Sequence, residues 1–236
     1  MNLYDDLIHE CMDLTQKSQT VRQFKKKEIA SWESEDEQNL ILRGDMLYEL
    51  GGGMLPAVSM LAFTSQLEME DEVVVIGEDL DTIKKDTPYA RITLLKVDDS
   101  LWTDNQKASR AMRRIGYTKY HIYPKGFMMR ISTSAAREPV RIGKEAVKQG
   151  LNFSRVGGTF IDAYHEHAEV QAVKIIFITD PDFPYRQLET YADKANKITK
   201  SLDTILDNLL MDCRSCAQKP ICDEVDGLRE FHQTHQ

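Results

Sequence analysis

Three cysteines near the C-terminus have the residue type and spacing of a metal site. Cys213 and Cys216 form a Cys-x2-Cys pair, and Cys222 follows after five further residues. Thiolates are soft, charged donors that suit zinc and iron–sulfur clusters, and a bound metal keeps them deprotonated. We expect these cysteines to bind metal, and we favour an iron–sulfur cluster, of the four-iron type, over zinc. Thiols that bind no metal, or that do redox chemistry, are the alternative.

A fourth protein ligand is missing from this run of cysteines. His232 and His235 follow it and are available to complete a Cys₃His zinc site. A four-iron cluster held by three cysteines leaves one iron open to Cys11 or to an external ligand. Cys11 itself falls on the apolar stripe of an expected helix, which favours a role as a buried apolar residue.

Three other groups of residues suggest chemistry less strongly. His165 and His167 are two positions apart, so on a helix their imidazoles point about 200° apart and do not share one metal. The run Gly51–Gly53 lacks the Lys-Ser/Thr of a phosphate loop, and we interpret it as a tight turn. Asp79 and Asp81 follow a strand, where we expect an ordinary acid pair rather than a Mg²⁺ site.

Composition limits the class of protein. The chain has 236 residues and a net charge of −8, which argues against a nucleic-acid-binding surface because phosphates attract concentrated positive charge. No apolar run approaches the roughly 20 residues that span a bilayer, and the N-terminus lacks the basic start of a signal peptide. We therefore expect a cytoplasmic protein without membrane contact, and clustered thiols in a reducing compartment more often bind metal than form disulfides.

The elements that must position these residues follow from apolar periodicity. We expect helices at residues 2–30, 56–63, 104–115, 134–149, 153–165 and 185–211. We expect strands at residues 73–76, 92–97, 119–123, 127–131 and 172–179. The last of these strands is almost wholly apolar, as a central strand covered on both faces would be.

Alternating strands and helices predict an α/β fold, with α+β as the alternative, built on a mixed sheet with flanking helices. We divide the chain into an N-terminal helical segment with a linker (residues 1–43), an α/β domain (44–211) and a cysteine-rich metal-binding tail (212–236). In this division the long helix at 185–211 leads directly into the tail.

Several stretches together resemble the β subunit family of CO dehydrogenase complexes, the carbon-monoxide-dependent (CO-methylating) acetyl-CoA synthases. Residues 46–52 (Met-Leu-Tyr-Glu-Leu-Gly-Gly) and 73–80 (Val-Val-Val-Ile-Gly-Glu-Asp-Leu) are similar to the start of that family's module. Residues 141–150 and 172–180 resemble two later segments, and the long helix then leads to the cysteines in the same order. The resemblance covers residues 44–225.

This resemblance implies an α/β domain that handles CoA and contacts partner subunits. It also implies that Cys213, Cys216 and Cys222 hold the four-iron part of a nickel–iron–sulfur cluster that joins CO, a methyl group carried by a corrinoid, and CoA. The implied partners are CO dehydrogenase, the corrinoid iron–sulfur protein and CoA.

Two departures from the family pattern bear on activity. The sequence has no fourth cysteine in the tail and no Cys-Gly-Cys, which in the family binds nickel, and the interval from Cys216 to Cys222 is short. We therefore expect a truncated relative that does not make acetyl-CoA alone, with an accessory, electron-transfer or regulatory role. The other hypotheses are a zinc-stabilised interaction module, and an α/β domain that binds CoA or another nucleotide and carries a structural tail.

Overall fold

A computed structural model of the chain describes residues 3–18, 20–37, 40–103, 105–130, 132, 134, 136–207, 217–225 and 228. Its largest sheet has five strands in the order β1-β5-β10-β6-β4. These strands are β1 (Val21–Lys25), β4 (Ala57–Thr64), β5 (Glu72–Ile76), β6 (Tyr89–Val97) and β10 (Val170–Ile178). Parallel and antiparallel pairs both occur in it, so the predicted α/β class with a mixed sheet is confirmed.

Strand β10 lies at the centre of this sheet and is buried along most of its length. It runs parallel to β5, with Ile176 opposite Val74, and antiparallel to β6, with Ile176 opposite Ile92. A continuous apolar strand requires cover on both faces. The prediction of a buried central strand at residues 172–179 is confirmed, although one of its two neighbours is antiparallel.

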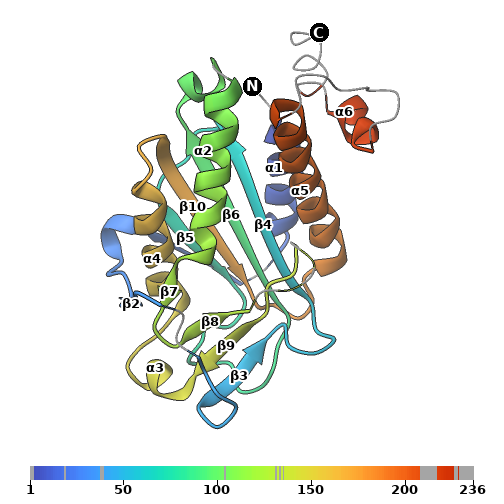
Figure 1. Cartoon of the computed structure of the whole chain (residues 1–236). Coiled ribbons are helices and arrows are strands. Elements are labelled where there is room, and N and C mark those ends of the chain that lie inside the picture. The colour runs from blue at the N-terminus through green and yellow to red at the C-terminus, as the bar shows by residue number, and fades with distance from the viewer. Residues whose placement is uncertain are drawn as a thin grey trace.

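Four long helices surround the sheet (Figure 1). They are α1 (Asp5–Gln16), α2 (Asn105–Tyr117), α4 (Phe153–His165) and α5 (Tyr185–Asp207). Helix α4 packs against β5 and β10, whereas α1 and α5 lie side by side next to β4. The hydroxyls of Tyr4 and Thr199 are 2.9 Å apart and join the start of α1 to α5. Two short helices, α3 (Lys144–Lys148) and α6 (Lys219–Glu224), complete the described set.

A smaller sheet closes one end of the molecule, at the bottom of Figure 1. It has the order β3-β9-β8 and is antiparallel throughout. Its strands are β3 (Met46–Leu50), β8 (Phe127–Met129) and β9 (Val140–Gly143). A separate two-stranded sheet of β2 (Ser34–Glu35) and β7 (Tyr123–Pro124) lies next to β8. A bridge between Val58 and Arg137 connects β4 to the segment that precedes β9.

The helix predicted over residues 2–30 is wrong beyond Gln16, because residues 21–25 form the edge strand β1. Val21 pairs with Ile76 of β5, and Arg22 Nη2 donates to the carbonyl oxygen of Gly77 at 3.1 Å. Helix propensity is a weak preference that tertiary pairing overrides. The domain boundaries at residues 44 and 212 stay predictions. Strand β1 belongs to the large sheet, and α1 packs against β4 and α5.

The helix predicted at residues 56–63 is also wrong, because this stretch is strand β4. All but one of its residues are buried, and it runs parallel to β6 with Leu61 opposite Thr93. Periodicity alone does not separate a short buried helix from a buried strand. The pairing with β6 and the packing of α5 decide for the strand.

Two further predictions around the small sheet are wrong. Residues Thr118–Tyr120 form a 3₁₀ turn, so the strand expected at 119–123 reduces to β7. Residues 134–149 contain β9 and the short α3 instead of one helix, because β9 pairs with both β3 and β8. By contrast, α2, α4 and α5 confirm three predicted helices, although α2 continues through Gly116 and residues 208–211 lie outside the described part of α5.

Among the described helices, none is long and apolar enough to cross a membrane.

The close approach of α4 to the sheet yields a testable expectation. A Cβ on Gly157 would lie 2.5 Å from Val73 Cγ2 and 3.2 Å from Phe177 Cε2. We expect Gly157→Ala to lower the free energy of unfolding by about 1–3 kcal/mol, because overpacking strains a dense core. The matched control is Gly44→Ala, since nothing lies within 4 Å of a Cβ there. Urea denaturation measures both, and equal stabilities of the two variants would contradict the packing described.

Candidate functional site

Of the three cysteines in the tail, only Cys222 is among the residues that the structure describes. Cys222 lies on α6 and its side chain is buried. Cys213 and Cys216 lie outside the described residues, as do His232 and His235. Within the part of the chain that the structure describes, no group of three or more His, Cys, Asp or Glu side chains could hold a metal ion. The donor set of three thiols therefore rests on the sequence.

Helix α6 is attached to α5. Lys194 Nζ and Glu224 Oε1 form an ion pair of 2.8 Å, and Ser201 Oγ donates to Gln218 Oε1 at 3.4 Å. These contacts place the helix that carries Cys222 alongside the helix that leads toward Cys213.

Cys11 is a core residue. It lies on α1 with no exposed surface, and burial raises the pKa of its thiol to about 12. A thiol must lose its proton to bind metal, so this environment disfavours ligation. The interpretation of Cys11 as a buried apolar residue is confirmed.

Two of the stretches that resemble the synthase family meet in the small sheet. Glu49 of β3 is directly opposite Arg141 of β9, and Arg141 Nε lies 3.5 Å from Glu49 Oε1. Arg130 also pairs with Glu49 Oε1. One nearly buried carboxylate thus receives two guanidinium groups, and its charge is satisfied by residues far away in sequence.

The other two stretches meet where β5 and β10 end. Gly77 has a φ of 98°, and a Cβ there would lie 2.5 Å from the backbone nitrogen of Asp180. Thr179 Oγ1 donates to the carbonyl oxygen of Glu78 at 2.6 Å. Tyr48 Oη donates to the carbonyl oxygen of Leu80, which links this edge to β3. All four stretches are therefore parts of one connected structure.

Asp79 has a structural role at the same edge. Its Oδ1 accepts hydrogen bonds from the backbone nitrogens of Leu80 at 2.8 Å and Phe153 at 2.9 Å. Its Oδ2 lies 3.4 Å from Arg22 Nη1. Asp79 thus holds the start of α4, which gives this acid a structural role.

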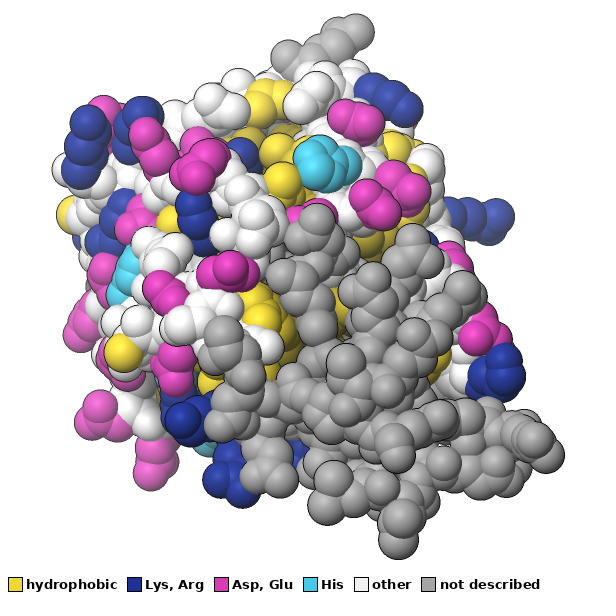
Figure 2. Space-filling model, turned by 90° about the horizontal axis from the view of Figure 1, so that it is seen from above, with side chains coloured by type: hydrophobic (Ala, Val, Ile, Leu, Met, Phe, Trp, Pro, Cys, Tyr) yellow, Lys and Arg dark blue, Asp and Glu magenta, His cyan; other side chains and the backbone are white. Residues whose placement is uncertain are grey.

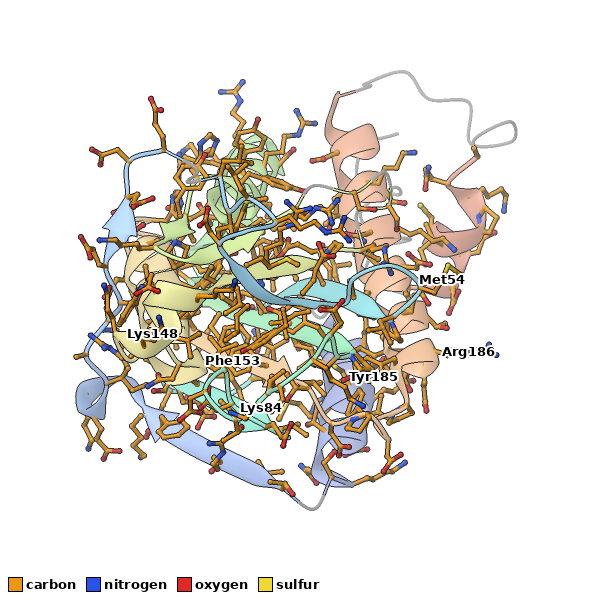
Figure 3. All side chains as sticks on the ribbon, turned by 90° about the horizontal axis from the view of Figure 1, so that it is seen from below. Met54, Lys84, Lys148, Phe153, Tyr185 and Arg186 are labelled. Atoms are coloured by element: carbon orange, nitrogen blue, oxygen red, sulfur yellow. The ribbon has the colours of Figure 1, made fainter. Side chains whose placement is uncertain are left out.

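The glycine run forms the tight turn that was predicted. Gly51 and Gly53 have φ values of 64° and 59°, a region that favours glycine. Arg137 donates to the carbonyl oxygens of Gly51 (2.9 Å), Gly53 (2.9 Å) and Leu55 (3.0 Å). Met54 at the tip is 99% exposed and lies at the periphery in Figure 3.

His165 and His167 bind different partners. His165 Nε2 lies 2.8 Å from Asp71 Oδ2, and His167 Nε2 lies 2.6 Å from Thr118 Oγ1. Desolvation and the nearby charge of Arg114 lower the pKa of His167. Each imidazole is therefore engaged by a different segment of the chain.

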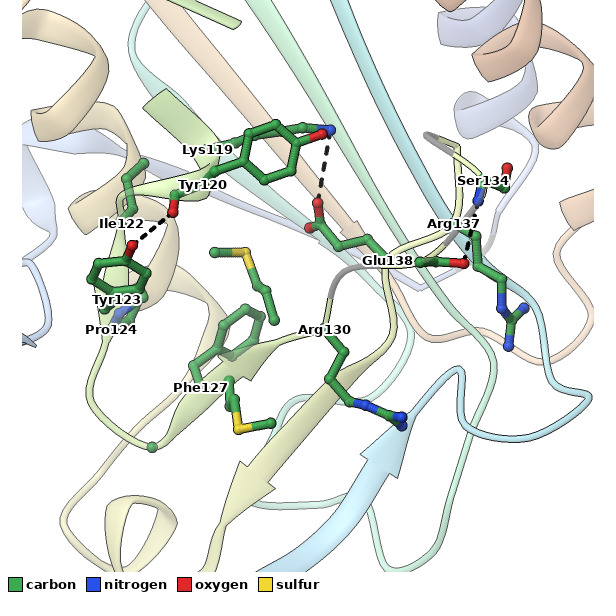
Figure 4. Close-up of a pocket in the computed structure, with 14 residues that line it drawn as sticks. Lys119, Tyr120, Ile122, Tyr123, Pro124, Phe127, Arg130, Ser134, Arg137 and Glu138 are labelled. Atoms are coloured by element: carbon green, nitrogen blue, oxygen red, sulfur yellow. Dashed lines mark hydrogen bonds and ion pairs between the residues drawn. The ribbon is translucent and has the colours of Figure 1, made fainter. Parts of the chain in front are cut away.

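A small cavity lies between the 3₁₀ turn at Thr118–Tyr120 and the small sheet (Figure 4). Its volume is about 60 Å³, and we call it the Lys119 cavity. Lys119, Arg130, Arg137 and Glu138 are its charged lining residues, and its apolar lining includes Phe127. In Figure 4, Arg130 and Arg137 lie on the opposite side of the cavity from Ile122 and Tyr123.

A buried ion pair adjoins this cavity. Arg91 is 1% exposed, and its Nη2 lies 2.6 Å from Glu138 Oε1. Lys119 Nζ is 3.8 Å from Glu138 Oε2, and Ser59 Oγ donates to the same oxygen at 3.4 Å. The Arg91 guanidinium also lies 4.3 Å from the centroid of the Phe160 ring on α4. Three separate segments of the chain, which carry Ser59, Arg91 and Lys119, thus converge on the Glu138 carboxylate.

A larger groove of about 700 Å³ runs between α2 and α4. Arg113, Arg114 and Tyr117 line it from α2, and Asp162 and Glu166 line it from α4. Arg113 pairs with Asp203 at 2.9 Å, and Arg114 pairs with Glu169. Elsewhere on the surface, the face shown in Figure 2 has acidic and basic side chains interspersed.

A family model of the CO dehydrogenase/acetyl-CoA synthase complex beta subunit matches residues 31–183. This chain belongs to that family. The match includes the small sheet, most of the large sheet and the Lys119 cavity, and it ends before Cys213. No curated protein matches the chain significantly. Within the matched region, the sequence motifs predicted the family but not the buried ion pair of Arg91 and Glu138.

The sequence did carry a signal for that pair. Arg91 lies within a stretch of β6 that is otherwise mostly apolar, and a charged residue in a buried strand requires a partner. Nothing in the sequence pointed to Glu138 as that partner, because the two residues are far apart in the chain and meet only through β4 and β6.

Removing the partner should be costly. We expect Glu138→Ala to lower the free energy of unfolding by about 3–5 kcal/mol, because it leaves the Arg91 charge buried and unpaired. The control is Glu33→Ala, which removes an exposed pair with Lys125 at 3.2 Å and should cost less than about 1 kcal/mol. A double-mutant cycle with Arg91→Met measures the coupling free energy between Arg91 and Glu138. If Glu138→Ala proved equally destabilising with and without Arg91, the pair would not be the cause.

Proposed function

We propose that this chain acts in CO and one-carbon metabolism and binds an iron–sulfur cluster of the four-iron type through Cys213, Cys216 and Cys222. Membership of the synthase family supports the metabolic role. The observation that carries the cluster is the attachment of α6 to α5. Because Gln218 contacts Ser201, both ends of the segment that contains Cys213 and Cys216 are held near α5, close to the helix that carries Cys222.

The proposed activity is cluster binding rather than complete acetyl-CoA synthesis. The nickel-binding Cys-Gly-Cys of the family is not among these 236 residues. We propose CO dehydrogenase or the corrinoid iron–sulfur protein as partners, since the family is a subunit of that complex. We also propose a cytoplasmic location, where thiols stay reduced and available to metal. His232, His235 or an external group would supply the fourth ligand.

Metal analysis under anaerobic conditions tests the cluster. We expect about four irons per chain with matching sulfide and a visible absorption band, as thiolate-bound clusters of this type contain. Cys216→Ser should lose the iron, and Cys11→Ala should keep it, because Cys11 has no exposed surface.

A content of about one zinc per chain, without a visible absorption band, would refute the cluster and indicate a structural zinc site. Loss of that zinc in a His232→Ala or His235→Ala variant would identify the fourth ligand. Iron retained in Cys216→Ser would contradict both forms of the proposal.

CoA binding is a second candidate function, and the groove between α2 and α4 favours it. Its volume of about 700 Å³ lies within the range of roughly 300–1,000 Å³ typical of ligand sites. Arg113 and Arg114 on one wall offer donors for phosphate groups, and Tyr117, which is 61% exposed, offers a ring for stacking.

CoA should therefore raise the melting temperature. A ligand that binds only the native state at 100 times its Kd adds about 2.7 kcal/mol of stability. We expect Arg113→Gln with Arg114→Gln to abolish this shift. The control is Lys197→Gln, which removes an exposed charge from α5. A CoA-induced shift of equal size in all variants would exclude this groove.

A further inference from the structure

The lining of the Lys119 cavity has an excess of positive charge. Three basic residues, Lys119, Arg130 and Arg137, line it with one acidic residue, Glu138, and Arg130 is also paired with Glu49 outside the lining. This excess is unusual in a chain whose net charge is −8. A cavity with low-dielectric walls and one sign of charge concentrates ions of the opposite sign.

The charge of Glu138, the single carboxylate of the lining, is already neutralised by the buried Arg91. Glu138 Oε1 lies 2.6 Å from Arg91 Nη2, and both side chains are at least nine-tenths buried. Arg91 Nε has no hydrogen-bond partner among the described residues. Two buried or nearly buried cations, Arg91 and Lys119, thus share one anion.

Lys119 is the cation left without close compensation. Its side chain is 11% exposed, and its ammonium lies 3.8 Å from Glu138 Oε2, which is too far for a hydrogen bond. It also lies 4.9 Å from the centroid of the Tyr120 ring, which offers a weak attraction. A nearly buried ammonium with these contacts retains donors that an anion in the cavity could accept from.

The size and the apolar wall limit the anion. A volume of about 60 Å³ holds several waters, since roughly 10–15 Å³ on this measure holds one, so a ligand of a few heavy atoms fits. Phe127 is 2% exposed and Ile122 is 3% exposed, and both line the cavity. An ion with oxygens on every side would leave some of them unpaired against these side chains.

From these observations we propose that the Lys119 cavity binds a small monocarboxylate of two or three carbons, with its carboxylate at Lys119 Nζ and its alkyl group against Phe127. The carboxylate supplies the missing negative charge beside Arg91, Glu138 and Lys119. The alkyl group fills the apolar part that a symmetric oxyanion does not.

This site is separate from the proposed cluster and CoA sites, so it can fail without them. The cavity lies within the family-matched region and contains none of the tail residues. Its volume of about 60 Å³ is also much smaller than the volume of about 700 Å³ of the groove between α2 and α4.

Titration of the full ¹⁵N-labelled chain with sodium acetate, followed by amide shifts, tests the proposal. We expect saturable shifts at Phe127 and Glu138, a similar response to propionate, and none to acetamide or sodium chloride at equal concentration. Lys119→Gln should weaken acetate binding by about tenfold or more, because a charge-assisted hydrogen bond is lost.

The matched control is Lys125→Gln, an exposed lysine close in sequence whose pair with Glu33 is on the surface. Acetate affinity should be unchanged in that variant. If Lys119→Gln does not fold, the comparison of acetate with acetamide in the unaltered chain still decides the role of charge.

Three results would overturn the proposal. Acetate and acetamide could act alike, shifts could saturate only at residues remote from the cavity, or Lys125→Gln could weaken binding as much as Lys119→Gln. Saturable shifts at Phe127 with phosphate or CoA, and none with acetate, would assign the cavity to a phosphate group and would equally refute a carboxylate site.

Discussion

The ion pair between Arg91 and Glu138 joins the parts of this molecule that the chain itself keeps apart. Arg91 belongs to β6 in the large sheet, and Glu138 lies in the segment that leads into β9 of the small sheet. Burying either charge alone would cost several kcal/mol, so each holds the other in place. The backbone agrees with this arrangement, since Glu138 N donates to the carbonyl oxygen of Ala57 on β4 at 2.9 Å. The small sheet, the Lys119 cavity and α4 are all positioned around this contact.

Other contacts connect the stretches that resemble the family to one another. Glu49 receives Arg141 and Arg130, Gly77 allows the close approach of Asp180, and Tyr48 reaches Leu80. Their common effect is to fix β3 beside the end of β5 and to hold the ends of β5 and β10 together.

The three sites that we propose, the cysteine tail, the groove between α2 and α4 and the Lys119 cavity, involve different parts of the chain. The tail cysteines lie beyond the family-matched region in the sequence, whereas the groove and the Lys119 cavity are lined by residues within it. Helix α5 is the connection, because it packs on β4 and also contacts α6 through Lys194 and Ser201.

The sequence by itself determined the class of fold, the central strand β10, the helices α2, α4 and α5, and the family. These follow from local patterns: a continuous apolar run can only be buried on both faces, and apolar residues at helical spacing need one covered side. It also predicted that Cys11 is a buried apolar residue. The cysteine ligands remain a prediction from spacing.

Only the tertiary structure decided the nature of residues 21–25 and 57–64 and the pairing of Arg91 with Glu138. A short apolar run is compatible with helix or strand, and β4 is a strand because β6 pairs with its backbone and α5 covers it. Residues 21–25 are a strand because β5 offered an open edge. The partner of a buried charge depends on which distant segment folding brings beside it, and no local pattern records that.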